Sequence, residues 1–146
     1  MKASYRLGMI PVLLLFLTGM GATCGGQGAE EPIAPGAATG SWKLVSSMSG
    51  QQLMEPPQWD GELHVVGDRY SRFYVRRSGM DSVPFASFSD AGSWYTQSNG
   101  SVVLTVEFSS VGQAVGNQYR DKVALTNDGR RLVITGNDFR EVWEVR

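Results

Sequence analysis

Residues 93–109 read SWYTQSNGSVVLTVEFS, and this stretch decides the fold class. Two runs rich in β-branched and aromatic residues flank the tripeptide SNG at 98–100. Asn-Gly between such runs is a strong hairpin signal, because the favoured two-residue turns need a positive φ. In the second run every other residue is apolar: Val102, Leu104, Val106 and Phe108. The pattern predicts an antiparallel pair of strands with one apolar face.

The same signal recurs on both sides of this hairpin. Gly-Asp at 67–68 and Asn-Asp-Gly at 127–129 also separate strand-like runs. These runs occupy residues 41–47, 62–66, 69–77, 93–97, 101–109, 122–126, 131–135 and 139–145. No segment carries a sustained helical stripe. We therefore predict an all-β domain with little helix, an antiparallel up-and-down barrel of about 7–8 strands whose closure removes unpaired edges.

Both ends of this region resemble a known family. Gly40-Ser41-Trp42, continuing as KLVS, resembles the Gly-x-Trp opening of lipocalin-like domains. Residues 130–146, RRLVITGNDFREVWEVR, are similar to the closing hairpin of small bacterial lipocalin-like domains. The resemblance spans most of residues 40–146. It implies an antiparallel barrel, often with an interior cavity for a small apolar molecule.

The resemblance also implies how one barrel end is closed. In lipocalins the Trp of the first strand closes the barrel floor, and an Arg from the last strand lies across it. Trp42 matches the first position. Arg140 and Arg146 share a face by alternation, so either of them can take the second.

The first 23 residues have the composition of a secretory signal. Lys2 and Arg6 precede an apolar run at 7–17, and small residues follow that run. The run is shorter than the roughly 20 apolar residues of a spanning helix. We expect residues 1–23 to be a signal peptide and the protein to be exported.

Cys24 is the only cysteine, so an internal disulfide is excluded. Its position resembles the lipidated cysteine of bacterial lipoprotein signals, although Gly21 and Thr23 depart from that motif. A free thiol, or ordinary signal-peptidase cleavage, is the alternative. We expect lipidation at Cys24, a flexible tether over 24–39 and the barrel domain over 40–146. Gly25 instead of Asp favours an outer-membrane lipoprotein facing the periplasm, with a soluble periplasmic or secreted protein as the alternative.

The charge balance argues against nucleic acid as a partner. Without the signal, 11 of the 13 basic residues remain against 14 acidic ones, a net charge of about −3. Membrane contact is expected through the N-terminal lipid only.

The sequence contains no convincing catalytic or metal constellation. His64 is the only histidine, and one imidazole without a second histidine or spare cysteine does not make a typical zinc or iron set. A Gly-x-Ser-x-Gly elbow is absent. We expect neither an enzyme, a metal nor a cofactor; a hydrolase that uses His64 is the least favoured alternative.

One strand-like run, RYSRFYVRR at 69–77, stands out. Alternate residues place two tyrosines and two arginines on one face: Tyr70, Arg72, Tyr74 and Arg76. Because unpaired buried arginines are costly, we favour an outward stripe, which suits a protein partner. In the opposite phase the stripe lines the cavity, and an Arg there would grip the carboxylate of an anionic amphiphile.

Two segments are too apolar for purely solvated loops, 51–59 and 78–92. They are expected near a barrel mouth, contributing Leu53, Met54, Trp59, Phe85 and Phe88. We favour packing as a small second core over a gated entrance. The leading hypothesis is a lipid-anchored lipocalin-like protein that binds a small apolar or amphiphilic ligand. The alternative is a solid-barrel interaction module of the cell envelope, without a ligand.

Overall fold

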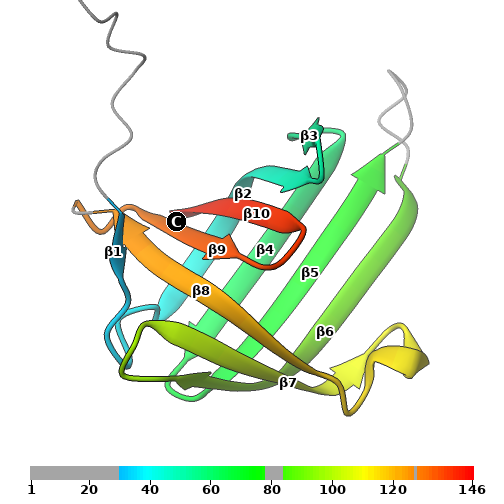
Figure 1. Ribbon diagram of the computed structural model, residues 1–146. Helices are drawn as coiled ribbons and strands as arrows, with labels where there is room; N and C mark the ends of the chain where they lie inside the picture. Colours follow the sequence, from blue (N-terminus) through cyan, green and yellow to red (C-terminus); the bar gives the residue numbers. More distant parts are fainter. Residues whose placement is uncertain (1–29, 78–83, 127) are drawn as a thin grey trace, which may run out of the picture.

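The computed structural model describes residues 30–77, 84–126 and 128–146. The predicted signal peptide and Cys24 lie outside these ranges. The described chain is all-β and forms a closed, antiparallel, up-and-down barrel of eight strands (Figure 1). The strands are β2 (Gly40–Ser49), β4 (Trp59–Val66), β5 (Arg69–Arg77), β6 (Pro84–Thr96), β7 (Ser101–Ser109), β8 (Gln118–Thr126), β9 (Arg131–Thr135) and β10 (Phe139–Val145). Each pairs with the next along the chain, and β10 returns to β2.

Two short strands lie outside this cycle. β1 (Glu30–Pro32) pairs with the end of β8, and β3 (Gln52–Met54) pairs with the end of β2. A 3₁₀ turn at Gly112–Ala114 joins β7 to β8 and is the only helical element in the described ranges. The all-β prediction is confirmed, and the predicted hairpin turns and alternation account for most of the strands.

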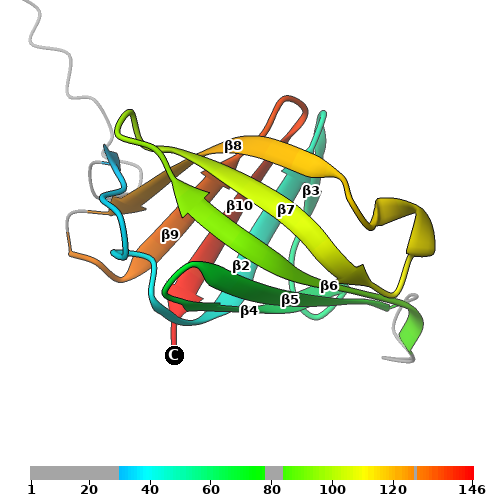
Figure 2. The same ribbon diagram turned by 90° about the horizontal axis from the view of Figure 1, so that it is seen from below.

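The two ends of the barrel differ. At one end, the closed end, the short β4–β5 and β6–β7 turns meet the segment that follows β1 (Figures 1 and 2). Ile33 and Ala38 of that segment are buried beside Trp42. At the other end, the open end, lie β3, the 3₁₀ turn and the β9–β10 turn. The chain thus covers one mouth of its own barrel.

Residues 30–39 belong to the folded domain, although their composition suggested a tether. Glu30–Pro32 extends the sheet beside β8, and the amide of Ile33 donates to the carbonyl of Val123 at 3.1 Å. Pro32 packs against Gly100 at the tip of the β6–β7 turn. Ile33 is buried and its backbone is hydrogen-bonded to β8, so this segment is part of the domain although the residues around it are rich in Gly, Ala and Pro.

The closed end is sealed without an arginine over Trp42. The Trp42 indole N–H donates to the carbonyl of Ala38 at 2.9 Å. Arg140 pairs with Glu30 and Arg146 with Glu62, each at 2.5 Å. The guanidinium of Arg72 lies over the rings of Tyr70 and Tyr74, not over Trp42. Trp42 is thus buried at the closed end with its indole N–H bound by the backbone of the N-terminal segment, while both candidate arginines pair with glutamates.

Strand β6 corrects two sequence expectations. It begins at Pro84, so residues 84–92 are strand and not loop. A β-bulge shifts its register with β7 between Ala91 and Gly92, so that Glu107 is the extra residue. Alternation reverses there, and Phe108, predicted to share the face of Val106, is 68% exposed.

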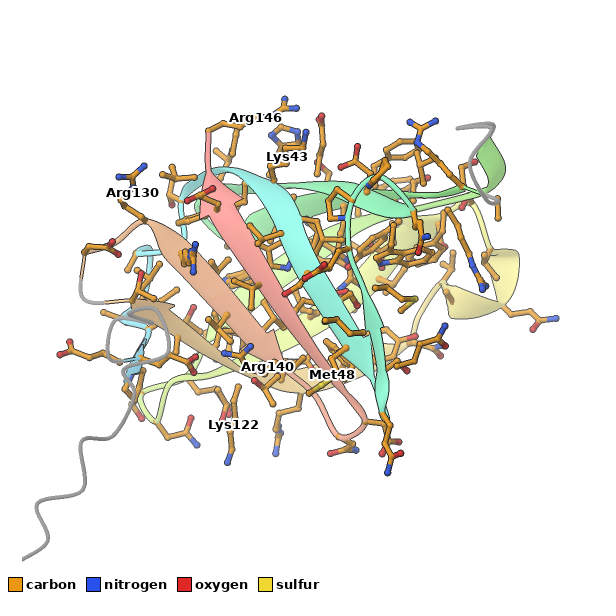
Figure 3. The ribbon with its side chains drawn as sticks, turned by 90° about the horizontal axis from the view of Figure 1, so that it is seen from above. Lys43, Met48, Lys122, Arg130, Arg140 and Arg146 are labelled. Atoms are coloured by element: carbon orange, nitrogen blue, oxygen red, sulfur yellow. The ribbon has the colours of Figure 1, made fainter. Side chains whose placement is uncertain are left out.

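The interior is apolar from the closed end to the middle of the barrel. The most deeply buried large side chains are Leu44, Leu63, Val65, Val102, Leu104, Val106, Val123, Leu132, Ile134 and Trp143. Basic side chains lie on the outer face instead (Figure 3): Lys43 on β2, Lys122 on β8, Arg140 on β10 and Arg146 directly after β10. The side chains of Arg72, Asp90 and Glu141, by contrast, lie inside the barrel.

Candidate binding site at the open end of the barrel

Strand β5 turns its Tyr/Arg face into the barrel. Tyr70 and Tyr74 are each 4% exposed, whereas Phe73 on the opposite face is 45% exposed. The outward placement favoured from the sequence is therefore wrong. That expectation assumed that a buried arginine would be unpaired and therefore costly, whereas Arg72 has an ion-pair partner inside the barrel. Arg76, further along the strand, is exposed near the rim.

Arg72 forms a bidentate ion pair with Asp90 of β6. Its Nε and Nη2 atoms donate to the two carboxylate oxygens at 3.0 and 2.7 Å. The guanidinium also lies over the rings of Tyr70 and Tyr74, 5.8 and 5.6 Å from their centroids. Burial opposes its charge, but the surrounding acidic groups, Tyr74 and Asp90 first, raise the pKa of Arg72 well above its usual value. Arg72 is thus a permanent buried cation.

Glu141 of β10 lies across the interior from this pair. The Tyr74 hydroxyl donates to both of its carboxylate oxygens, at 2.8 and 2.9 Å, and the Trp143 indole N–H donates at 3.2 Å. Burial raises the pKa of Glu141, while Arg72 and the two donors lower it by less. Burial likewise raises the pKa of Asp121 on β8, which is 5% exposed.

Aromatic rings lie beside Arg72 and Glu141 at the open end of the barrel. Tyr74 stacks on Trp59 and on Phe88, with centroids 5.4 and 5.8 Å apart. A hollow of about 240 Å³ opens here. We call it the mouth pocket, and its lining residues are Trp59, Arg72, Tyr74, Phe88, Phe139 and Glu141.

Two buried polar side-chain atoms in the described ranges have no hydrogen-bond partner. They are Nε1 of Trp59, which lines the pocket, and the hydroxyl of Tyr70, whose ring lies beside Arg72 and outside the pocket lining. Burial raises the pKa of Tyr70 to about 12, so this hydroxyl stays protonated. Unpartnered buried donors are rare in folded proteins and mark places where a bound molecule can supply an acceptor.

The predicted entrance is only partly assembled. Trp59 and Phe88 meet in the mouth pocket, as the sequence suggested. Leu53 is 59% exposed, and neither it nor Met54 lines the pocket. The side chain of Phe85 lies outside what the structure describes. Phe139 and Glu141 were missed, although alternation with Trp143 along the last strand would have placed them inside.

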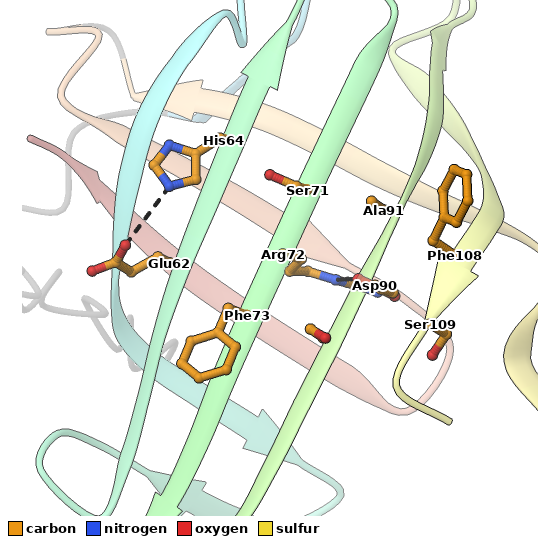
Figure 4. Close-up of a pocket in the computed structure, with 10 residues that line it drawn as sticks. Glu62, His64, Ser71, Arg72, Phe73, Asp90, Ala91, Phe108 and Ser109 are labelled. Carbon is orange, nitrogen blue, oxygen red and sulfur yellow. Dashed lines mark hydrogen bonds and ion pairs between the residues drawn. The ribbon is translucent and has the colours of Figure 1, made fainter. Parts of the chain in front are cut away.

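A second hollow, of about 430 Å³, lies on the outer wall of β4–β7 (Figure 4). His64 lines it, with Nδ1 2.9 Å from the Ser41 hydroxyl and Nε2 3.7 Å from Glu62. The second distance is too long for a hydrogen bond, and Glu62 also binds Arg146. His64 and Glu62 are about two-fifths exposed, so this trio lacks the buried, hydrogen-bonded geometry of a catalytic triad.

The described ranges contain no group of three or more His, Cys, Asp or Glu residues placed to hold a metal ion. No helix in them is long and apolar enough to cross a membrane. Comparison of the chain with family models, curated proteins and solved structures finds no match. The barrel is thus established by the structure, and a function has to be argued from the site.

Proposed function

We propose that this protein is an exported, lipocalin-like barrel that binds a small apolar or amphiphilic molecule non-covalently in the mouth pocket. The observation that carries the proposal is the unpartnered indole N–H of Trp59, buried in the wall of an aromatic hollow. An unsatisfied buried donor costs roughly 1–3 kcal/mol. A ligand with an acceptor atom would remove that cost while its apolar part covers the rings.

The phase of β5 supports binding over the alternative of a solid barrel. An interaction module was expected to show the Tyr/Arg stripe outside and a filled interior. Tyr70, Arg72 and Tyr74 of the stripe lie inside, and the open end is hollow beside Trp59. The pocket is smaller than the roughly 300–1,000 Å³ of drug-sized sites, so its ligand is a single ring or a short chain.

The interaction module remains the second candidate because of the outer wall. Phe73 and Phe108 are 45% and 68% exposed beside the hollow that His64 lines. Aromatic residues are enriched in interaction sites. The two candidates occupy opposite faces of the same strands and can be separated by mutation.

For location we propose a bacterial cell-envelope protein, held at the outer membrane by a lipid on Cys24 and facing the periplasm. The signal-like residues 1–23 and the single cysteine after them support this. Five residues separate Cys24 from β1, which lies at the closed end of the barrel (Figure 1). A lipid on Cys24 would hold that end nearer the membrane than the mouth.

The test is native mass spectrometry of the exported Cys24→Ser variant, purified without detergent. We expect an additional mass that disappears on solvent extraction, or uptake of one from a mixture of small aromatic and short-chain amphiphiles. Trp59→Ala should abolish it, and Phe73→Ala, on the outer face, should leave it unchanged. A clean mass with no uptake would overturn the binding function and favour the interaction module.

A further inference from the structure

The outer wall of β4–β7 carries two exposed phenylalanines beside the hollow of about 430 Å³ that His64 lines. We call this hollow the outer hollow. Phe73 and Phe108 lie on opposite sides of it (Figure 4), and they are 45% and 68% exposed. Scattered single apolar residues on a surface need no explanation, but apolar side chains grouped around a hollow mark a contact surface.

The register of the strands explains why the wall is hollowed here. One cross-strand row on the outer face reads His64, Ser71, Ala91 and Phe108, and the neighbouring row reads Glu62, Phe73 and Ser89. Three small side chains therefore meet on neighbouring strands and form the floor of the outer hollow: Ser71, Ser89 and Ala91. The two phenyl rings stand beside this floor.

A β-bulge turns Phe108 out to this wall. Regular alternation along β7 would point its ring into the barrel, but the extra residue Glu107 makes Phe108 the register partner of Ala91, which lines the outer hollow. The bulge depends on Gly92, where an added Cβ would collide with the backbone of β7. Bulges are frequent where a side chain is re-aimed for function. The exposed ring is thus a built feature of the wall.

The floor and the two rings carry no charge, and the acidic residues at the edges are already paired within the chain. Glu62 binds Arg146 at 2.5 Å, and Glu107 binds Arg69 at 2.6 Å. The cores of protein interfaces are depleted in charged residues, whereas their rims are polar. A partner that covered this wall would bury rings and small side chains and leave these two carboxylates paired.

We infer that the partner is a second copy of this chain, joined through the outer hollow in a twofold-symmetric dimer. A twofold contact needs a surface that is complementary to itself, because each copy presents the same patch. This wall meets that requirement, since the protruding ring of Phe108 lies directly beside a floor of small residues. Phe108 of each copy would enter the outer hollow of the other and pack near its Phe73 ring, in the manner of aromatic pairs.

The inference goes beyond the proposed function and does not depend on it, because the mouth pocket lies on the inner face of the barrel wall. The outer hollow spans parts of only four strands, which is small for a permanent interface. We therefore expect a reversible dimer whose population rises with protein concentration by mass action.

The test is sedimentation velocity of the exported Cys24→Ser protein over about a hundredfold range of concentration. Loss of the single cysteine ensures that a disulfide cannot link two copies. We expect a monomer–dimer equilibrium without larger species, because a twofold contact is closed.

Two substitutions address the two halves of the contact. Phe108→Ser removes the ring, and Ala91→Glu places a charge on the floor that receives it. Each should weaken dimerisation about tenfold or more, as truncation of a central aromatic contact does. Met48→Ser removes an exposed apolar side chain from the outer wall of β2 and is the matched control, which should change dimerisation little. If Ala91→Glu does not fold, Ser71→Glu takes its place.

A mixture of the two variants tests the reciprocal fit. Ala91→Glu keeps the ring and blocks the floor, whereas Phe108→Ser keeps the floor and lacks the ring. A mixed dimer retains one of the two contacts between ring and floor, and a dimer of either variant with itself retains none. We expect the mixed pair to associate more tightly than either variant alone and less tightly than the parent protein.

The outcomes leave the two proposals separable. A protein that stays monomeric over the whole range would overturn the dimer, as would equal dimerisation of Phe108→Ser and Met48→Ser or no gain in the mixture. Growth into species larger than a dimer would also overturn it, because it indicates an open contact. Ligand uptake should be the same in Phe108→Ser and the parent protein, so loss of the dimer would leave the binding function standing.

Discussion

Arg72 and Asp90 are direct partners in the β5–β6 register, and their side chains form a two-armed ion pair inside the barrel. The side chains are 11% and 1% exposed. The opposite charges of these two inward-facing side chains thus neutralise each other, whereas either side chain alone would be an unpaired buried charge. The pair explains how a strand as polar as β5 can form part of the wall.

Replacing Arg72 alone should be strongly destabilising. Arg72→Met leaves Asp90 buried without a counter-charge, and we expect a loss of about 3–5 kcal/mol in the free energy of unfolding. The double variant Arg72→Met/Asp90→Leu should recover most of it, because both charges are then gone. Urea denaturation measures both. Arg69→Met, which removes an exposed pair with Glu107, is the control and should have a much smaller effect. Similar losses for Arg69→Met and Arg72→Met would contradict the buried position of Arg72.

The two buried tyrosines of β5 should respond in opposite ways to loss of the hydroxyl. Tyr74 donates to Glu141, so Tyr74→Phe should cost about 1.5–3 kcal/mol, the range for hydrogen bonds to charged groups. The hydroxyl of Tyr70 has no partner, and Tyr70→Phe should be neutral or stabilising, by about 1 kcal/mol. Thermal unfolding followed by circular dichroism compares them under one condition. A loss on Tyr70→Phe as large as that on Tyr74→Phe would show that Tyr70 has a partner.

The buried carboxyls should make the empty protein less stable as pH rises. Their pKa values are raised above the ordinary 4.5 of Glu141 and 3.8 of Asp121, chiefly by burial. Between its ordinary and its raised pKa, each group binds more protons in the folded than in the unfolded state. The free energy of unfolding therefore falls as pH rises through that window. Urea midpoints from pH 4 to pH 8 should decline, and the decline should be shallower in Glu141→Gln. Parallel profiles for the two proteins would rule out Glu141 as a source of the slope.

The fold could be predicted because its signals are local. The turns after Val66, Thr96 and Thr126 contain the Gly, Asn and Asp residues that hairpins need, and alternation marked most of the strand faces. The register of β6 against β7 could not be predicted in this way. A bulge depends on close approach of two backbones, and nothing in the alternation around Phe108 signals that its face reverses.

The site was only half predictable, for a different reason. The stripe on β5 was recognised, but its direction depended on whether a partner for Arg72 existed on another strand. Asp90 lies 18 residues further along, in a segment that resembled a loop. Pairings between strands of this kind are visible only once the register is known.

The bulge itself provides the last prediction. Gly92 faces Thr105 so closely that a Cβ atom there would lie 1.8 Å from the Thr105 carbonyl oxygen. Gly92→Ala must separate β6 from β7 at that point, and we expect a loss of about 3 kcal/mol or more, the size of other severe backbone and overpacking changes. Gly112→Ala, in the 3₁₀ turn with no atom within 4 Å of the added Cβ, is the matched control and should change stability little. Denaturant unfolding of both variants gives the comparison. If Gly92→Ala were as stable as Gly112→Ala, the two strands would not approach at the bulge, and Phe108 would be free to return to the interior face.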